Sequence, residues 1–150
     1  MKNFQTRLVD TDFKKPERHV PSVEDYMTKK LITFKKDTNI NVVIKSLLDN
    51  RISGAPVLDD AGKVVGLIDD KDCLNVLFGN VYNQFPTTKA TVSDYMSNVM
   101  RTINVNQNIL DVAAIFTSSP FKRLLVMDDN DRLVGQVSRR DILRAIKELT

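Results

Sequence analysis

The residues best placed to do chemistry lie near the C-terminal end of the chain, where Ser138 and Asp141 follow a short apolar run that ends at Val137. Their S-x-x-D spacing is that of a capping box, in which a hydroxyl and a carboxylate close the start of a helix. The same helix start gathers unpaired N–H groups and the positive end of the helix dipole, which favour a bound anion. The pattern therefore indicates a helix cap or an anion site, and these two roles are compatible.

The stretch that carries these residues occurs twice. Gly135 and Asp141 correspond to Gly66 and Asp72, and this single offset aligns the chain without a gap from residue 23 to residue 77. The aligned identities include Val23/Val92, Asp25/Asp94, Tyr26/Tyr95, Met27/Met96, Asn39/Asn108, Ile40/Ile109, Val57/Val126 and Val65/Val134. One offset held over this distance indicates an internal duplication.

Each repeat is predicted to fold in the order β-α-β-β-α. Strands are expected at Leu31–Phe34, Ala55–Leu58 and Val64–Ile68 in the first copy, and at Met100–Val105 and Leu124–Met127 in the second. Helical spacing of apolar residues predicts the helices, with Ile40, Val43, Ile44, Leu47 and Leu48 in one, Ile109, Val112, Ala113 and Phe116 in its counterpart, and Ile142, Ala145, Ile146 and Leu149 in the last. Neither repeat is large enough to bury its sheet alone. We therefore predict an α+β fold in which two repeats pack sheet to sheet about a pseudo-two-fold axis.

The boundaries follow from this repeat. Residues 1–20 are predicted to be an N-terminal arm, 21–79 the first repeat, 80–90 a linker and 91–150 the second repeat. Ser22 and Thr91 are expected to cap short helices that lead into the two repeats. The pairs Asp59–Asp60 and Asp128–Asp129 begin hairpin turns, and solvated turn residues are the preferred interpretation over metal ligands.

Composition argues against several classes of protein. No run of about 18 apolar residues is present, as a membrane-spanning helix requires. Cys73 is the only cysteine, so an intrachain disulfide or a multi-cysteine metal site is excluded, and His19 is interpreted as a surface residue. The 22 basic and 19 acidic residues are interspersed, which argues against a nucleic-acid partner. The polar segment Met1–Lys15 favours a cytoplasmic location, because it lacks the apolar core of a secretory signal.

The tandem repeat resembles a CBS domain pair, also called a Bateman module. The resemblance rests on the Asp-Tyr-Met motifs at 25–27 and 94–96, on the strand entry at 54–57, and on the Gly-to-Asp stretches 66–72 and 135–141. It covers residues 23 to 149. It implies a nucleotide site in the cleft between the repeats, where the Asp that opens the last helix holds the ribose and a Ser or Thr three residues earlier faces the phosphate.

The second repeat matches this pattern. The resemblance assigns Asp141 to the ribose and Ser138 to the phosphate, with Lys122 at the basic position and Arg123 beside it. Thr102 and Ile103 would line the adenine. Arg139 and Arg140 are either exposed residues of the first helical turn or phosphate partners, with Arg139 the stronger candidate. Leu125 stands where the first repeat has Pro56, a departure that affects the shape of the adenine pocket.

The first repeat matches poorly. Asp72 is present, but Asp69 replaces the hydroxyl residue and Ser53 replaces the basic one. Asp69 is a good helix cap. Beside a phosphate, however, like charges about 4 Å apart repel by roughly 4 kcal/mol at an effective dielectric of 20. We therefore expect this half to be empty, or to be a weak second site around Asp72.

The leading hypothesis is a stand-alone regulatory module that binds an adenosyl ligand, namely AMP, ADP, ATP or S-adenosylmethionine, without another cofactor or a metal. It would signal to a protein target by a change in conformation or assembly. The alternative is a dimerising scaffold with a vestigial cleft. An enzyme is not expected, because the chain has no Cys/His pair, catalytic triad or Gly-rich phosphate loop.

A homodimer is expected as well. Leu143 lies off the apolar stripe of the last helix, Ile142–Ile146–Leu149, and Leu74 lies off that of the first repeat's final helix, Cys73–Val76–Leu77. A helix that is apolar over such a wide arc is usually buried on two sides. The final helices of both repeats are predicted to meet across the dimer.

Overall fold

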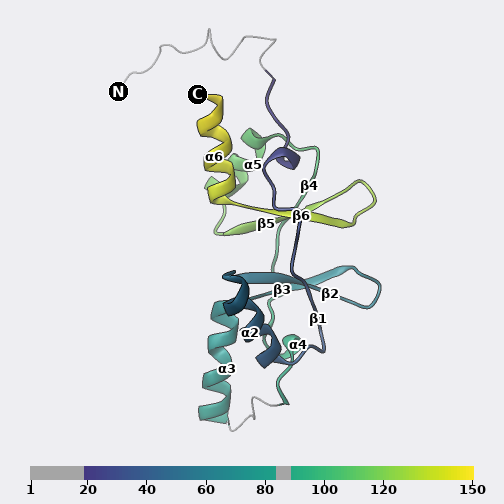
Figure 1. Cartoon of the computed structure of the whole chain (residues 1–150), viewed down its shortest axis with the longest axis vertical. Coiled ribbons are helices and arrows are strands. Elements are labelled where there is room, and N and C mark those ends of the chain that lie inside the picture. Colours follow the sequence, from purple (N-terminus) through teal and green to yellow (C-terminus); the bar gives the residue numbers. More distant parts are fainter. Residues whose placement is uncertain (1–18, 84–88) are drawn as a thin grey trace, which may run out of the picture.

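The computed structural model describes residues 19–83 and 89–150, which form two similar halves stacked along the longest axis of the molecule (Figure 1). In chain order the first repeat comprises η1 (Val23–Asp25), β1 (Phe34–Lys35), α2 (Ile40–Asn50), β2 (Gly54–Leu58), β3 (Val64–Asp69) and α3 (Asp70–Asn83). The second comprises α4 (Val92–Tyr95), β4 (Thr102–Asn104), α5 (Ile109–Thr117), β5 (Arg123–Met127), β6 (Leu133–Ser138) and α6 (Arg139–Leu149). The order β-α-β-β-α is therefore confirmed in both repeats.

The two sheets share one pairing scheme. β2 pairs parallel with β1 and antiparallel with β3, and β5 pairs in the same way with β4 and β6. A register shift interrupts the antiparallel pair after Val57 and again after the equivalent Val126. In Figure 1 the two sheets lie next to each other at the middle of the molecule, with α2 and α3 beyond one sheet and α5 and α6 beyond the other. The α+β fold of two repeats packed sheet to sheet is therefore confirmed.

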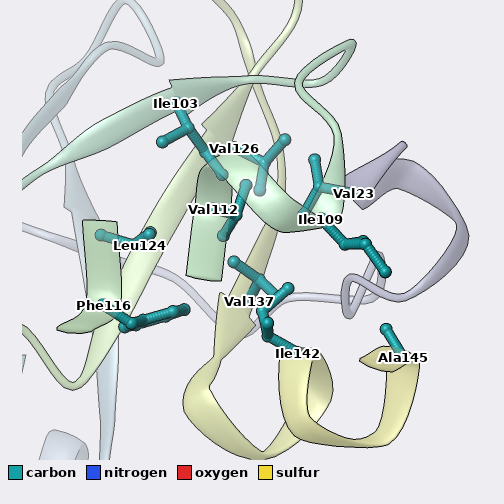
Figure 2. Close-up of a cluster of buried hydrophobic side chains, with 10 residues drawn as sticks. All are labelled: Val23, Ile103, Ile109, Val112, Phe116, Leu124, Val126, Val137, Ile142 and Ala145. Atoms are coloured by element: carbon teal, nitrogen blue, oxygen red, sulfur yellow. The ribbon is translucent and has the colours of Figure 1, made fainter. Parts of the chain in front are cut away.

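Each hydrophobic core is completed by the segment that precedes the other repeat. Val23 of η1 is fully buried in the core of the second half, where Figure 2 shows it beside Ile109. Two backbone hydrogen bonds hold it there, from Val23 N–H to Gln107 at 2.8 Å and from Ile109 N–H to Pro21 at 3.1 Å. Val92 of α4 is fully buried in the core of the first half in the same manner. The leading segments are thus exchanged between the repeats.

Two helices bury narrower apolar stripes than the sequence predicts. α2 buries Val43 and Leu47, but Leu48 is 72% exposed. In α3, Val76 is buried whereas Leu77 is 60% exposed. The prediction that Leu48 and Leu77 face the core is wrong, because one step along a helix turns a side chain by about 100° away from its buried neighbour.

The hairpin acids are structural, as predicted. Asp59 Oδ1 accepts hydrogen bonds from the N–H groups of Ala61 and Lys63, and Asp128 Oδ1 closes the second hairpin in the same way. Gly62 has a φ of +85°, and Asp131 adopts a φ of +64° in the other turn. The second hairpin therefore has the left-handed conformation without a glycine, which costs a non-glycine residue more.

Several smaller expectations concern the edges of the repeats. α3 continues to Asn83, so the linker predicted at 80–90 begins inside this helix, and its residues 84–88 lie outside the described part. Of the N-terminal arm only the last two residues are described, and His19 is exposed.

Cys73 is half-buried against the first core, and its burial raises the pKa of the thiol to about 11. Within residues 19–83 and 89–150, none of the helices has the length and apolar character needed to cross a membrane.

Candidate functional site

Most of the predicted site residues meet at one end of the second sheet. β4 and β5 are parallel, so both begin at this end, and the antiparallel β6 finishes there before α6 starts. Thr102 pairs with Leu125 at the start of the strands, and Arg123 pairs with Ser138 across β5 and β6. Lys122 immediately precedes β5 and is exposed. The strand order thus brings two hydroxyls, two cations and a helix N-terminus to the same end of the sheet.

The start of α6 is closed by a complete capping box. Asp141 Oδ2 accepts hydrogen bonds from Ser138 N–H at 2.9 Å and from Ser138 Oγ at 3.1 Å, while Asp141 N–H donates to Ser138 Oγ at 3.2 Å. The second carboxylate oxygen, Oδ1, lies 3.3 Å from Arg144 Nη1. A carboxylate oxygen has more than one acceptor position, so Oδ1 can also accept from a ligand hydroxyl. The capping role of Asp141 therefore leaves room for a binding role.

Two predicted residues are placed differently from the others. The Ile103 side chain is only 4% exposed and belongs to the buried core of the second half, so it does not present an apolar surface to a ligand (Figure 2). Arg139 is exposed, and its side chain lines a groove between α5 and α6. Lys122 is consequently a better candidate for a phosphate contact than Arg139.

Arg123 connects the two repeats. Its Nη2 donates a hydrogen bond of 2.6 Å to Ser53 Oγ, and its Nη1 lies where a Cβ on Gly54 would be. Gly54 and Arg123 are equivalent positions in the duplication, so the missing side chain of one repeat makes space for the long side chain of the other. This link was not predicted, although the pairing of a glycine with an arginine at equivalent positions was a signal for it.

The equivalent end of the first sheet carries two acids. Asp69 and Asp72 form the corresponding box, with Asp72 N–H donating to Asp69 Oδ1 at 2.8 Å and Asp69 N–H donating to Asp72 Oδ2 at 3.0 Å. Burial and the neighbouring Asp69 carboxylate raise the pKa of Asp72 to about 6. This helix start is therefore negatively charged where the second repeat has a neutral hydroxyl.

The segments that follow the Asp-Tyr-Met motifs pack against glycines in the last strands of the opposite repeats, Gly135 in β6 and Gly66 in β3. Thr28 N–H donates to Gln136 at 2.8 Å, and Leu67 N–H donates to Ser97 at 2.8 Å, so each leading segment joins the opposite sheet as an extra edge. A Cβ on Gly135 would lie 2.6 Å from Met27 Sδ, and one on Gly66 would lie 2.7 Å from the Ser97 oxygen. These glycines therefore admit a close approach of protein atoms rather than of a ligand.

The comparison with known proteins identifies the family. The CBS domain profile matches residues 23–79 and 92–148, which are the two repeats described above. The chain belongs to the CBS domain family. Its two CBS domains form a tandem pair, as predicted from the repeat.

Relatives and solved structures agree with this assignment. The CBS domain-containing protein CBSX1 of Arabidopsis thaliana, a chloroplastic protein, is 29% identical over 93% of this chain and 70% of its own length. Another relative is much longer, and the chain spans only 42% of it. The structure of Arabidopsis CBSX2 in complex with AMP superposes with a TM-score of 0.73 at 27% identity, covering 85% of this chain and 97% of CBSX2. The CBS domain pair of MJ0100 in complex with 5′-methylthioadenosine and S-adenosyl-L-methionine gives a TM-score of 0.73 at 26% identity, covering 88% and 100%.

Proposed function

We propose that this CBS pair is a regulatory module that binds an adenosyl ligand at the second-repeat end of the inter-repeat cleft. The observation that carries this proposal is the difference between the two helix starts. The start of α6 combines the Ser138 hydroxyl with nearby cations, whereas the start of α3 has the Asp69 and Asp72 carboxylates. Only the first of these suits an anionic group beside a sugar.

Each residue has a definite task in this proposal. Asp141 Oδ1 accepts hydrogen bonds from the ribose hydroxyls, and Ser138 Oγ together with the first N–H groups of α6 faces the phosphate. Lys122 supplies a positive charge at the same edge. Thr102, exposed at the start of β4, borders the base. Arg123 is held by Ser53 and can exchange that contact for the phosphate.

The ligand class rests on two relatives. Both solved structures named above contain adenosine derivatives, AMP in one and two 5′-sulfur compounds in the other. Their shared group is the adenosine that Asp141 would hold. We therefore propose AMP, ADP, ATP or S-adenosylmethionine as the ligand, and a binding role without turnover.

The proposal is tested by titration calorimetry with these four compounds. Asp141→Ala should weaken binding at least tenfold, because each charge-assisted hydrogen bond to the ribose is worth about 1.5–3 kcal/mol. Asp72→Ala is the matched control, since it removes the equivalent capping acid from the other repeat. It should leave the affinity nearly unchanged.

Three results would contradict this proposal. Loss of binding in Asp72→Ala but not in Asp141→Ala would place the site in the first repeat. Absence of binding to every adenosyl compound would favour the dimerising scaffold instead. Conversion of the ligand during incubation would contradict the role without turnover.

We also propose that the module is a homodimer formed through the outer helices. Leu74 and Leu143, predicted to lie outside the core stripes, are 65% and 70% exposed. Leu143→Glu should convert a species of twice 17.0 kDa into one of 17.0 kDa in light scattering at tens of micromolar. An unmodified protein that is already monomeric under these conditions would contradict the dimer.

A further inference from the structure

Arg123 of the second repeat is hydrogen-bonded to the first repeat. Its Nη2 donates a hydrogen bond of 2.6 Å to Ser53 Oγ, just before β2. The two sheets that this contact joins lie next to each other in Figure 1. Ser53 is exposed and Arg123 is half-buried, so water competes for this hydrogen bond and its net strength is modest.

The first repeat has space for the guanidinium. Gly54 follows Ser53, and Arg123 Nη1 lies where the Cβ of a larger residue would be. The same space is bordered by Asp69, whose Cβ lies 3.0 Å from the position of a Cβ on Gly54. The guanidinium is thus held by one neutral hydroxyl, beside the acidic start of α3.

The backbone of Arg123 nevertheless belongs to the proposed ligand site. Arg123 pairs with Ser138 across β5 and β6. Leu124 and Val137 lie in the second core, so the alternation of side chains along a strand places Arg123 and Ser138 on the opposite face. Cross-strand neighbours on one face have Cβ atoms about 4.5–5.5 Å apart, a separation shorter than an extended arginine side chain. Rotation of the side chain can therefore move the guanidinium from Ser53 to the start of α6.

The two positions offer the cation different partners. Ser53 provides a neutral hydroxyl, whereas a phosphate beside Ser138 provides anionic oxygens that a guanidinium can bind through two parallel N–H groups. A sulfonium group or an uncharged 5′ group provides no anionic acceptor. The position of Arg123 should therefore depend on the charge of the ligand.

We infer that Arg123 determines the selectivity of the second-repeat site for phosphate, and that Ser53 and Gly54 are positioning residues that hold its guanidinium away from this site. The inference rests on the adenosyl site proposed above. The first repeat competes with the bound phosphate for one cation, so the apparent affinity for AMP falls as the fraction of molecules with Arg123 on Ser53 rises. A ligand with a phosphate releases this link between the repeats, whereas S-adenosylmethionine leaves it in place.

The variant Ser53→Ala tests this competition, because it removes the acceptor in the first repeat and leaves Arg123 intact. Titration calorimetry should show AMP binding tightened about three- to tenfold, the change that corresponds to the loss of one competing hydrogen bond. Adenosine and S-adenosylmethionine should bind with nearly unchanged affinity, because neither carries a phosphate. Unchanged or weaker AMP binding, or an equal gain for adenosine, would overturn the inference.

A second variant shows whether the gain passes through Arg123. Arg123→Met removes the cation and keeps an unbranched apolar side chain, so AMP binding should weaken while adenosine binding changes little. In this background Ser53→Ala should no longer affect AMP binding, and a gain that persists would contradict the role assigned to Ser53. Ser93→Ala is the matched control, because it makes the same change at an exposed serine whose hydroxyl pairs with Thr91. It should leave all three affinities unchanged.

Failure of this inference is distinguishable from failure of the proposed function. AMP binding that Asp141→Ala weakens and Ser53→Ala leaves unchanged would overturn only the role of Arg123 in selectivity. Absence of AMP binding in the unmodified protein and in Ser53→Ala alike would overturn the ligand site, and the inference with it.

Discussion

At the scale of single residues, the two repeats cap equivalent helices with side chains that differ in charge. Ser138 and Asp69 occupy equivalent positions, and each accepts a hydrogen bond from the N–H of the aspartate three residues later. Either side chain is a good helix cap. They differ in charge, and this difference decides which helix start suits an anion.

The variant Ser138→Asp separates capping from binding. It should preserve the cap of α6, as Asp69 does for α3, and weaken AMP binding at least tenfold because a carboxylate then faces the phosphate. Adenosine, which lacks the phosphate, should lose much less affinity. Calorimetry with both compounds provides the comparison, and equal losses would show that Ser138 does not lie near the phosphate.

The acidic pair of the first repeat predicts a pH dependence of stability. Because the pKa of Asp72 is raised to about 6, the folded state holds this proton more tightly than the unfolded chain does. The contribution of Asp72 to the free energy of unfolding is therefore fully present at low pH, and it is lost as the pH rises through about 6. Asp69→Ser removes one charge and keeps the cap, so the gain in the free energy of unfolding should grow as the pH is raised towards neutrality. Urea denaturation at several pH values measures this gain, and a pH-independent effect would contradict the explanation.

At the scale of elements, the sequence was informative about what each segment is and less informative about what it touches. The constant offset of the duplication and the apolar spacing predicted the strands and helices in their correct order. Periodicity identifies the residues that face a core, but it contains no information on which core. The burial of Val23 in the second half and of Val92 in the first was therefore not predicted.

For the candidate site, the sequence predicted the contacts between residues close together in the chain but not the contacts between distant ones. Local spacing identified the Ser138–Asp141 box, because its hydrogen bonds join residues only three apart. The Arg123–Ser53 link joins residues that are distant in the sequence, so only the structure revealed it. Ile103 was assigned to a ligand by resemblance, whereas its side chain is part of the core.

The exchanged leading segments make Gly66 a sensitive position. A Cβ there would lie 2.7 Å from the backbone oxygen of Ser97, which cannot move without disturbing its hydrogen bond with Leu67. Gly66→Ala should therefore lower the free energy of unfolding by about 1–3 kcal/mol, the usual cost of overpacking. Lys63→Ala, an exposed change in the preceding hairpin, is the matched control and should be nearly neutral. Chemical denaturation of both variants measures the difference, and a neutral Gly66→Ala would contradict the close approach.

At the scale of the whole molecule, the exchange ties the stability of each repeat to the other. The segment around Val23 precedes the first repeat in the chain but completes the core of the second. The segment around Val92 does the reverse. A ligand or a partner copy that acts on one half therefore acts on a core to which both halves contribute, which suits a module whose proposed role is to signal.

This coupling predicts which half of the molecule is destabilised by a substitution of Val23. Val23→Ala should lower the free energy of unfolding by about 2–3 kcal/mol, because Val23 is fully buried and its loss removes two methyl groups and leaves a cavity. Hydrogen exchange should accelerate mainly in the second half, around the start of α5 where Val23 lies beside Ile109, although residue 23 lies at the start of the first repeat. Val57→Ala, an equally buried change in the first core, should accelerate exchange in β2 and β3 instead. If both variants loosened the first half, Val23 would not be the residue that completes the second core.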